Sequence, residues 1–209
     1  SHILVETRQM LRAARKYGRI VQCGTQNRSD VGLRAAREYV RAGNLGAPVL
    51  GRAFDYARRE SIGRVAGPRP SPASVDYDLF RGPAPLVPVR RKTFHYDWHW
   101  FWSTATGDCG NRGTHTIDHT RWLLGADGPP RRAFSVGGRF GFNDDGQTPN
   151  TQITWFDYDA APIMYELRTL TRAQGDPAMD TFRGTRACIV EFENGYLHAY
   201  RGGAVAFDS

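Results

Sequence analysis

The 209-residue sequence contains no long apolar run: nowhere do about 18 apolar residues follow one another, as a membrane-spanning helix requires. Its first residues, Ser1 to Leu4, also lack the basic start and apolar centre of a secretory signal peptide. The three cysteines are odd in number and far apart, which argues against a disulfide framework and fits a reducing compartment. We therefore expect no membrane partner and a cytoplasmic location, unless an export signal precedes Ser1.

Lysine is scarce as well, because Lys16 and Lys92 are the only two in the chain. Lysine and arginine together number 28 and give a net charge of +7, so the positive charge comes almost entirely from arginine. The arginines are scattered singly or in short groups, whereas nucleic-acid binding proteins usually gather such charge on one face or carry a known motif. We therefore expect no nucleic-acid partner.

Hydrophobic residues make up 40% of the chain and aromatic residues 12%, which is typical of a folded globular protein. The apolar spacing predicts a helix over Val5–Tyr17, followed by a short buried strand over Ile20–Gly24. A helix, a turn and a strand at the start are typical of the last unit of an α/β layer. Such a unit cannot bury both faces alone, so preceding sequence is expected to be missing. The sequence also stops at Phe207-Asp208-Ser209 without a terminating helix, so the C-terminal end is expected to be truncated too.

The rest of the chain predicts an α+β domain built on an open, mainly antiparallel sheet with helices on one face. We expect a helix from Ser29 or Asp30 to Arg41, and a second helix that ends at Leu124 with Gly125 as its cap. Ser61–Pro88 is too rich in proline and glycine for a helix or sheet, so it is predicted to be an ordered arm anchored by Val75, Tyr77, Leu79 and Phe80. The predicted strands are Val49–Tyr56, Ala133–Phe140, Thr151–Tyr158, Ile163–Leu170, Ala187–Phe192 and Tyr196–Arg201.

Chemically useful side chains are concentrated between His95 and Gly125, which holds four of the six histidines and four of the five tryptophans. Imidazoles beside carboxylates can carry protons or bind a metal, and indole rings form flat walls that suit sugar or nicotinamide rings. On the predicted helix, His115, Asp118, His119 and Trp122 share one face. An imidazole with a carboxylate one turn away is a workable general acid or base. The alternative is structural: His119 and Asp118 bond only to neighbouring backbone.

The segment from His95 to His99 allows three interpretations. Histidines at positions i and i+4 would form a zinc site with His115 if the segment were helical, but its run of Tyr and Trp is a poor helix former, so we expect no metal. Alternating tryptophans would also fit a strand that packs on the core. The same aromatic rings would equally line a sugar pocket.

Three stretches resemble the Gfo/Idh/MocA (glucose–fructose oxidoreductase/inositol dehydrogenase) family, whose members are nicotinamide-dependent enzymes acting on sugars, polyols and related substrates. AARKYGRIVQCGTQNRS (Ala13 to Ser29) resembles the last helix and strand of the family's Rossmann domain. YVRAGNLGAPVLGRAFDY (Tyr39 to Tyr56) resembles the helix and first strand of the sheet domain that follows. The most specific stretch, GDCGNRGTHTIDHTRWLLG (Gly107 to Gly125), resembles the helix that carries the family's active-site histidine.

This helix usually has the pattern Asp-x-x-x-His, a second Asp three residues later and an Arg-Trp or Arg-Tyr pair. The present chain has Asn111-x-x-x-His115, then Asp118 and Arg121-Trp122. The resemblance implies that His115 takes or returns the proton of a substrate hydroxyl, and that Asn111 and Asp118 orient it. Because an asparagine cannot accept a proton, either the relay or the reaction differs from the usual one.

The resemblance also assigns binding residues and a subunit arrangement. Gln26, Asn27 and Arg28 match the segment that closes over the nicotinamide of NAD or NADP. The residues expected to contact the carbohydrate substrate are His95, Tyr96, Asp97, Trp98, His99 and Arg121. Sheet faces of this family commonly pack against a second subunit, so a homo-oligomer is expected.

Two parts of the family pattern are absent from the 209 residues: the Gly-rich phosphate loop and the Glu-Lys-Pro motif. The second motif usually stands just before a Ser-His pair such as Ser1-His2. We therefore expect residues 1–28 to be the last helix and strand of a truncated Rossmann domain. Residues 29–209 are expected to form the substrate-binding and oligomerisation domain, also truncated at its C-terminus. Alone, the 209 residues are expected neither to bind NAD(P) well nor to turn over.

The sequence thus predicts the substrate domain of an NAD(P)-dependent oxidoreductase acting on a sugar, polyol or related carbohydrate. One alternative is a relative that uses transient oxidation to cleave a glycoside or eliminate a group, which the Asn111 substitution keeps open. Another is a non-catalytic carbohydrate-binding module, and a metal-dependent hydrolase comes third. Upstream sequence discriminates between enzyme and binding module, because an intact Gly-rich loop and Glu-Lys-Pro motif belong only to the enzyme.

Overall fold

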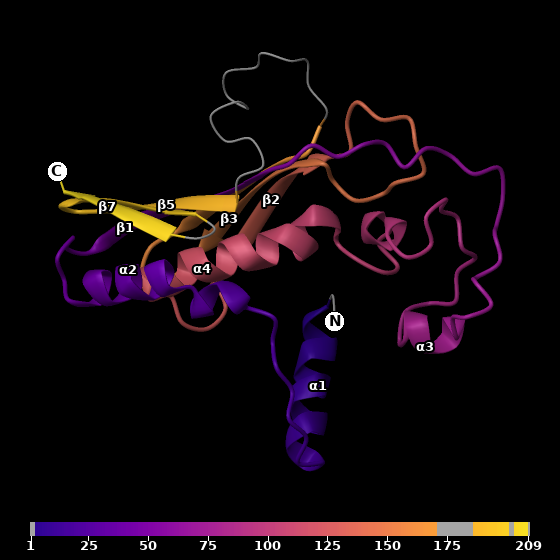
Figure 1. Ribbon diagram of the computed structural model, residues 1–209, viewed down its shortest axis with the longest axis horizontal. Helices are drawn as coiled ribbons and strands as arrows, with labels where there is room; N and C mark the ends of the chain where they lie inside the picture. The colour runs from indigo at the N-terminus through magenta and orange to yellow at the C-terminus, as the bar shows by residue number, and fades with distance from the viewer. Residues whose placement is uncertain (1–2, 171–185, 201–202, 209) are drawn as a thin grey trace.

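The computed structural model describes residues 3–170, 186–200 and 203–208 (Figure 1). The elements follow in the order α1 (Leu4–Lys16), 3₁₀ helix η1 (Gln26–Ser29), α2 (Val31–Arg41), β1 (Pro48–Tyr56), α3 (Tyr77–Arg81), 3₁₀ helix η2 (Asp97–Trp100), π-helical turn η3 (Cys109–Gly113), α4 (Thr114–Leu124), β2 (Arg132–Gly138), β3 (Thr151–Asp157), β4 (Ile163–Arg168), β5 (Arg186–Phe192), β6 (Gly195–Tyr200) and β7 (Gly203–Asp208).

One seven-stranded sheet forms the body of the molecule, with the strand order β2-β3-β4-β1-β5-β6-β7. All neighbouring pairs are antiparallel except β1 and β4, which run parallel. A parallel pair needs a long crossover connection, and here it contains the arm, α4, β2 and β3. Helices α2 and α4 cover one face of the sheet (Figure 1). The predicted α+β class, with a mainly antiparallel open sheet and helices on one face, is confirmed.

The core lies between α4 and the middle strands. Side chains alternate across a strand, so Ile163, Tyr165 and Leu167 of β4 point to the helices and are fully buried. On β1, Gly51 lets α4 approach closely, because a Cβ atom there would lie 2.8 Å from a Leu124 methyl carbon. This close packing fixes α4 against the sheet and so fixes the side chains that α4 carries.

Both long helices beside the sheet begin or end where the sequence predicts. Asp30 caps α2 through a 2.9 Å hydrogen bond from the backbone N–H of Leu33, which is itself buried. Gly125 ends α4 in the left-handed conformation, with φ of +71°, which glycine adopts at little cost. Leu123 and Leu124, in the last turn of α4, are buried in the core.

The predicted strand at Ile20–Gly24 is wrong. The segment has no regular structure, and Ile20 and Val21 are exposed. A strand needs a neighbour for its backbone hydrogen bonds, and every strand within the described ranges belongs to the seven-stranded sheet, which this segment does not join. The helix before it, α1, is present but stands away from the sheet, with none of its residues buried (Figure 1).

The far edge of the sheet holds a strand that the sequence analysis missed. Strand β7 pairs antiparallel with β6, and its run of small residues gave no alternation signal. The other strands match the predicted ones to within about two residues at each end. Residue 201, the predicted end of β6, lies outside the described residues.

The arm between residues 61 and 88 contains one short helix, α3, which begins after the capping side chain of Asp76. Of the predicted anchors, Tyr77 and Phe80 pack against Phe94, with ring centroids 6.2 Å and 5.2 Å from it. Leu79 is 79% exposed, so it is not an anchor. Residues 61–104, which include the arm, α3 and η2, form a lobe beside the sheet (Figure 1). Only one side of so short a helix can face the rest of this lobe, so Leu79 points outwards.

A buried ion pair ties the start of the arm to the loop after β2. Asp144 accepts two hydrogen bonds from the Arg139 guanidinium and one from the backbone N–H of Ile62. Burial alone would raise the pKa of Asp144, but the hydrogen bonds from Arg139 and Ile62 outweigh it and lower the pKa to about 2.

This pair predicts a pH-dependent contribution to stability. A carboxyl whose pKa falls on folding stabilises the native state above its unfolded value of 3.8, and the contribution is lost as pH falls towards about 2. The variant Asp144→Asn is therefore expected to lower the melting temperature at pH 7 and to lower it less at pH 2.5. Thermal unfolding of both proteins at the two pH values measures this; an equal difference at both would contradict it.

Candidate active site

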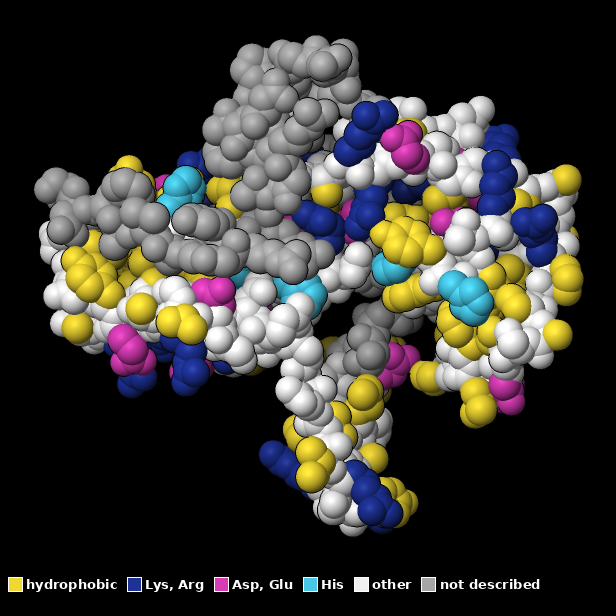
Figure 2. Space-filling view, in the orientation of Figure 1, with side chains coloured by type: hydrophobic (Ala, Val, Ile, Leu, Met, Phe, Trp, Pro, Cys, Tyr) yellow, Lys and Arg dark blue, Asp and Glu magenta, His cyan; other side chains and the backbone are white. Residues whose placement is uncertain are grey.

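A pocket of about 880 Å³ opens beside the N-terminal end of α4. Its walls come from three regions: Glu6 of α1 with Cys23 and Gly24 after it, the end of α3 with the turn that follows (residues 80–84), and the segment from η2 to the first turn of α4. Figure 2 shows the hollow between α1 and the lobe that carries α3. Of the predicted site residues, the pocket brings together Trp98, His99, Asn111 and His115.

The backbone before His115 is a π-helical turn, η3, which continues directly into α4. Such turns often occur at functional sites, because the extra residue changes which side chains face a cavity. Gly113 is required in this turn, since a Cβ atom there would lie 2.7 Å from the Tyr165 hydroxyl oxygen. The turn and the first helical turn of α4 place Asn111 and His115 in the same pocket.

The aromatic wall of the pocket comes from the 3₁₀ helix η2, so of the three interpretations of this segment the strand does not form. Trp98 stacks on His99 with ring centroids 3.8 Å apart, and both line the pocket. The His99 Nδ1 atom lies 2.6 Å from the Tyr96 carbonyl oxygen, which fixes the orientation of its ring. Trp100 is buried and Trp102 is half exposed, so the tryptophans divide between core, pocket and surface.

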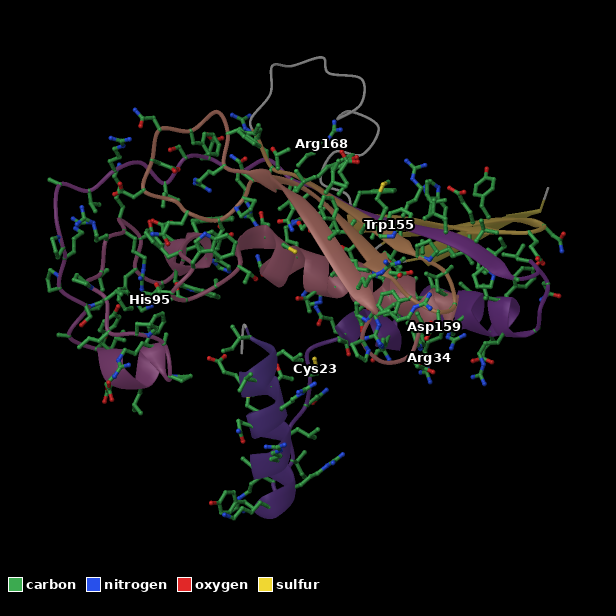
Figure 3. The ribbon with its side chains drawn as sticks, turned by 180° about the vertical axis from the view of Figure 1, so that it is seen from behind. Cys23, Arg34, His95, Trp155, Asp159 and Arg168 are labelled. Atoms are coloured by element: carbon green, nitrogen blue, oxygen red, sulfur yellow. The ribbon has the colours of Figure 1, made fainter. Side chains whose placement is uncertain are left out.

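Three other predicted substrate contacts lie outside the pocket lining. His95 is exposed in the lobe that carries α3 (Figure 3). Asp97 is buried and accepts a hydrogen bond from the backbone N–H of Thr93. The Tyr96 hydroxyl accepts a 2.7 Å hydrogen bond from Arg59. Their contact with a substrate stays a prediction.

The 3₁₀ helix η1 packs against one face of α4, which Asp118, His119 and Trp122 share. Arg28 donates to both carboxylate oxygens of Asp118, at 2.8 Å and 2.7 Å, and lies 5.7 Å from the Trp122 ring centroid. The Asn27 amide nitrogen lies 3.1 Å from Nδ1 of the buried His119. These contacts couple the segment after α1 to the helix that carries His115.

The remaining predicted residues also lie away from the pocket lining. Gln26 is exposed, and Arg121 donates to the Gly128 carbonyl at 2.9 Å at the other end of α4. A cofactor role for Gln26, Asn27 and Arg28 therefore stays a prediction, as does an orienting role for Asp118.

Sequence reasoning missed a buried ion pair behind the pocket. Asp108 is fully buried, and Arg59 donates to both of its oxygens at 2.8 Å. The hydrogen bond to Asp108 raises the pKa of Arg59. The Asn111 side-chain amide also donates to Asp108, at 3.3 Å. Because 49 residues separate Arg59 from Asp108 in the chain, no local pattern connects them.

A second buried carboxylate, Asp55 on β1, holds the start of α4 on the sheet. It accepts a hydrogen bond from Thr116 at 2.9 Å and one from Tyr165 at 3.2 Å, and Arg112 lies 3.3 Å away. Burial, followed by the charge of Asp55, raises the pKa of the Tyr165 hydroxyl, so it stays a neutral donor. The position of η3 thus depends on polar contacts as well as on apolar packing.

Two features are absent from the ranges that the structure describes. No group of three or more His, Cys, Asp or Glu side chains there is arranged to hold a metal ion. No helix in the same ranges is both long and apolar enough to cross a membrane.

Known structures share this fold. The WlbA dehydrogenase from Bordetella pertussis, in complex with NADH and UDP-GlcNAcA, aligns with a TM-score of 0.64 and 13% identity over 96% of this chain and 51% of that one. GenD2 from gentamicin A biosynthesis, in complex with NAD, aligns with a TM-score of 0.60 and 17% identity over 92% of this chain and 43% of that one. An oxidoreductase from Agrobacterium radiobacter, in complex with NAD+, L-tartaric acid and magnesium, aligns with a TM-score of 0.56 and 13% identity over 98% of this chain and 50% of that one.

The chain thus spans about half the length of the solved structures it matches. A search of curated proteins finds no matching sequence. Residues 33–164 match the model of the oxidoreductase family, C-terminal alpha/beta domain, of the Gfo/Idh/MocA proteins. Since that match covers more than half of the sequence, the chain belongs to the Gfo/Idh/MocA oxidoreductase family.

Proposed function

We propose that this chain is the substrate domain of an NAD(P)-dependent oxidoreductase that transfers a hydride between the nicotinamide and a sugar, polyol or related carbohydrate. One observation carries the proposal: in a member of an oxidoreductase family, His115 and Asn111 share a pocket with the flat Trp98–His99 wall. An apolar ring face with a few convergent polar groups is the usual environment of a carbohydrate.

Oxidation of a hydroxyl group requires a proton acceptor at the oxygen. The His115 imidazole serves as that acceptor, because an imidazole titrates near neutral pH and lies at the pocket surface. Trp98 holds the apolar face of the sugar ring, and Asn111 contacts a hydroxyl group. In the reverse direction, protonated His115 returns the proton to the oxygen of the carbonyl.

The cofactor supplies the hydride acceptor when bound, and NAD or NADP is proposed because the similar structures named above contain NADH, NAD or NAD+. Within this chain, the Cys23–Gly24 segment forms the pocket wall on the α1 side. Its backbone leaves space, because a Cβ atom on Gly24 would meet no atom closer than 3.9 Å. We propose that the nicotinamide end of the cofactor lies against this segment, with residues 1–28 belonging to the nucleotide-binding domain.

Cofactor binding tests the proposal directly. The protein, at the full length that its gene encodes, is titrated with NADH and with NADPH while the reduced nicotinamide fluorescence is followed. Saturable binding of either nucleotide, and reduction of the oxidised form by a panel of hexoses and polyols, is the expected result. A folded full-length protein that binds neither nucleotide would overturn it and leave a carbohydrate-binding module as the better interpretation.

Asn111 favours one second candidate, an enzyme that uses NAD only transiently while it cleaves a glycoside or eliminates a group. The two reactions differ in what happens to the hydride. A dehydrogenase accumulates NADH together with oxidised sugar, whereas the second enzyme returns the hydride in each cycle. Absorbance at the NADH band during product formation therefore separates them.

We also propose that the chain forms a homo-oligomer through the open face of its sheet. Phe134 and Val136 of β2 and Ile153 and Trp155 of β3 point to the same side and are 41–68% exposed (Figure 3 shows Trp155). Exposed apolar clusters of this kind commonly mark protein–protein contacts. Charges of both signs lie beside these apolar side chains: Arg132 pairs with Asp157, and Glu166 is the cross-strand partner of Ile153. A second copy of the chain is the proposed occupant, because the same face of a two-fold partner brings apolar side chains against apolar ones and offers charges of both signs around them.

Replacing Phe134 by lysine places a charge in the middle of this contact and is expected to shift the protein towards a smaller species. Light scattering coupled to size-exclusion chromatography measures the mass of each variant. Leu79→Lys is the matched control, because Leu79 is equally apolar and exposed but lies on α3. Equal masses for Phe134→Lys and the unmodified protein would show that the open face is not the interface.

A further inference from the structure

The least expected polar group beside the pocket is Asp108, which lies directly behind Asn111. Its carboxylate is fully buried and does not line the pocket. Arg59 holds both oxygens at 2.8 Å, and the Asn111 amide nitrogen lies 3.3 Å from one of them. Asn111 itself lines the pocket, so its side chain lies between a buried acceptor and the cavity.

The chemistry of the two groups determines which way the Asn111 amide faces. An ionised carboxylate only accepts hydrogen bonds, whereas an amide carries a donor nitrogen and an acceptor oxygen. The amide nitrogen therefore faces Asp108, and the carbonyl oxygen is directed to the other side. We propose that Asp108, held by Arg59, positions Asn111 so that its carbonyl oxygen accepts a hydrogen bond from a substrate hydroxyl in the pocket.

Arg59 makes this arrangement rigid. Its third nitrogen, Nη1, donates to the Tyr96 hydroxyl at 2.7 Å, and its guanidinium lies 5.6 Å from the Trp100 ring centroid. The ion pair leaves no net charge behind the pocket, so the site presents a neutral acceptor one helical turn before His115. Such an acceptor selects a hydroxyl donor and disfavours a carboxylate or phosphate oxygen at the same place.

The inference rests on the proposed function for its substrate, but not for the orientation of the amide. It also explains what asparagine does here: it is an oriented hydrogen-bond acceptor. An aspartate in its place would bring a second carboxylate close to Asp108, and like charges at that distance are not both ionised without cost. Asp108 and Asn111 therefore form a matched pair.

The orientation is tested without substrate or turnover. Full-length protein labelled with ¹⁵N-asparagine gives side-chain amide signals, and the Asn111 signal is identified by its loss in Asn111→Ser. In Asp108→Asn, this signal is expected to shift and to exchange faster with water. Asp144→Asn is the matched control, because Asp144 is bonded by Arg139 in the same two-point manner away from the pocket. An Asn111 signal that is the same in Asp108→Asn and in the unmodified protein would overturn the proposal.

The role in substrate binding is tested with the hexose or polyol that the full-length enzyme oxidises. Loss of an oriented hydrogen bond predicts that KM rises roughly 3- to 10-fold in Asp108→Asn while kcat changes less than about 2-fold. In Asp144→Asn, KM is expected to stay unchanged. An unchanged KM in Asp108→Asn would refute the contact between Asn111 and substrate. If the full-length protein bound no nucleotide, the proposed function would fail, but the amide experiment would still test the orientation of Asn111.

Discussion

Replacing His115 by glutamine is expected to lower kcat by about 10²- to 10⁴-fold, the usual contribution of a positioned general base. Glutamine keeps a polar side chain of similar size but cannot accept the hydroxyl proton near neutral pH. The substitution is at the pocket surface and not in the core between α4 and the sheet, so the fold is expected to persist. Stopped-flow measurement of NAD(P)H formation under single-turnover conditions reports the chemical step directly.

A matched substitution distinguishes catalysis from a general effect of losing a histidine. His198 lies on β6 between Leu197 and Ala199, which belong to the buried core, so it points to the face of the sheet opposite to α4. The variant His198→Gln is therefore expected to leave kcat unchanged. The pH profile gives a second criterion, since a rate limited by proton removal rises with pH as the base loses its proton. If His115→Gln turned over at a rate close to that of the unmodified enzyme, His115 would not be the base.

The histidine helix shows how far sequence alone reaches. Its end at Gly125, its buried leucines and the face shared by Asp118, His119 and Trp122 all follow from 3.6-residue periodicity and glycine chemistry. These are local properties, fixed within one helix. The partners of that face, Asn27 and Arg28, are about 90 residues earlier in the chain, and no periodicity predicts such contacts.

The same limit explains the errors elsewhere. Ile20 and Val21 have the composition of a buried strand, but a strand forms only where a neighbour completes its hydrogen bonds. Trp98 and Trp100 alternate as in a strand, yet η2 forms there, so the two rings point into the pocket and into the core. Where tertiary contacts determine the backbone conformation, composition predicts the wrong secondary structure, although it correctly identifies the segment that contributes to the pocket or its wall.

Arg59→Met is expected to destabilise the protein by about 3–5 kcal/mol, because it leaves a fully buried carboxylate without its cation. Methionine retains much of the side-chain volume against Trp100 and Tyr96, so the loss comes mainly from Asp108. Urea unfolding at pH 7 measures it. The matched control is Arg132→Met: Arg132 also pairs with an aspartate, Asp157, but is 84% exposed, and exposed pairs contribute only about 0–1 kcal/mol.

A double variant shows whether the unpaired charge is the cause. If the cost in Arg59→Met arises from the buried Asp108 carboxylate, then Arg59→Met combined with Asp108→Asn removes the charge and regains part of the stability. If the cost arises from lost packing of the guanidinium on Trp100, Asp108→Asn lowers the stability further instead of restoring it. Recovery would also show that Asp108 stays ionised in the folded protein only because Arg59 pairs with it. An ionised Asp108 is what keeps the amide nitrogen of Asn111 turned away from the pocket.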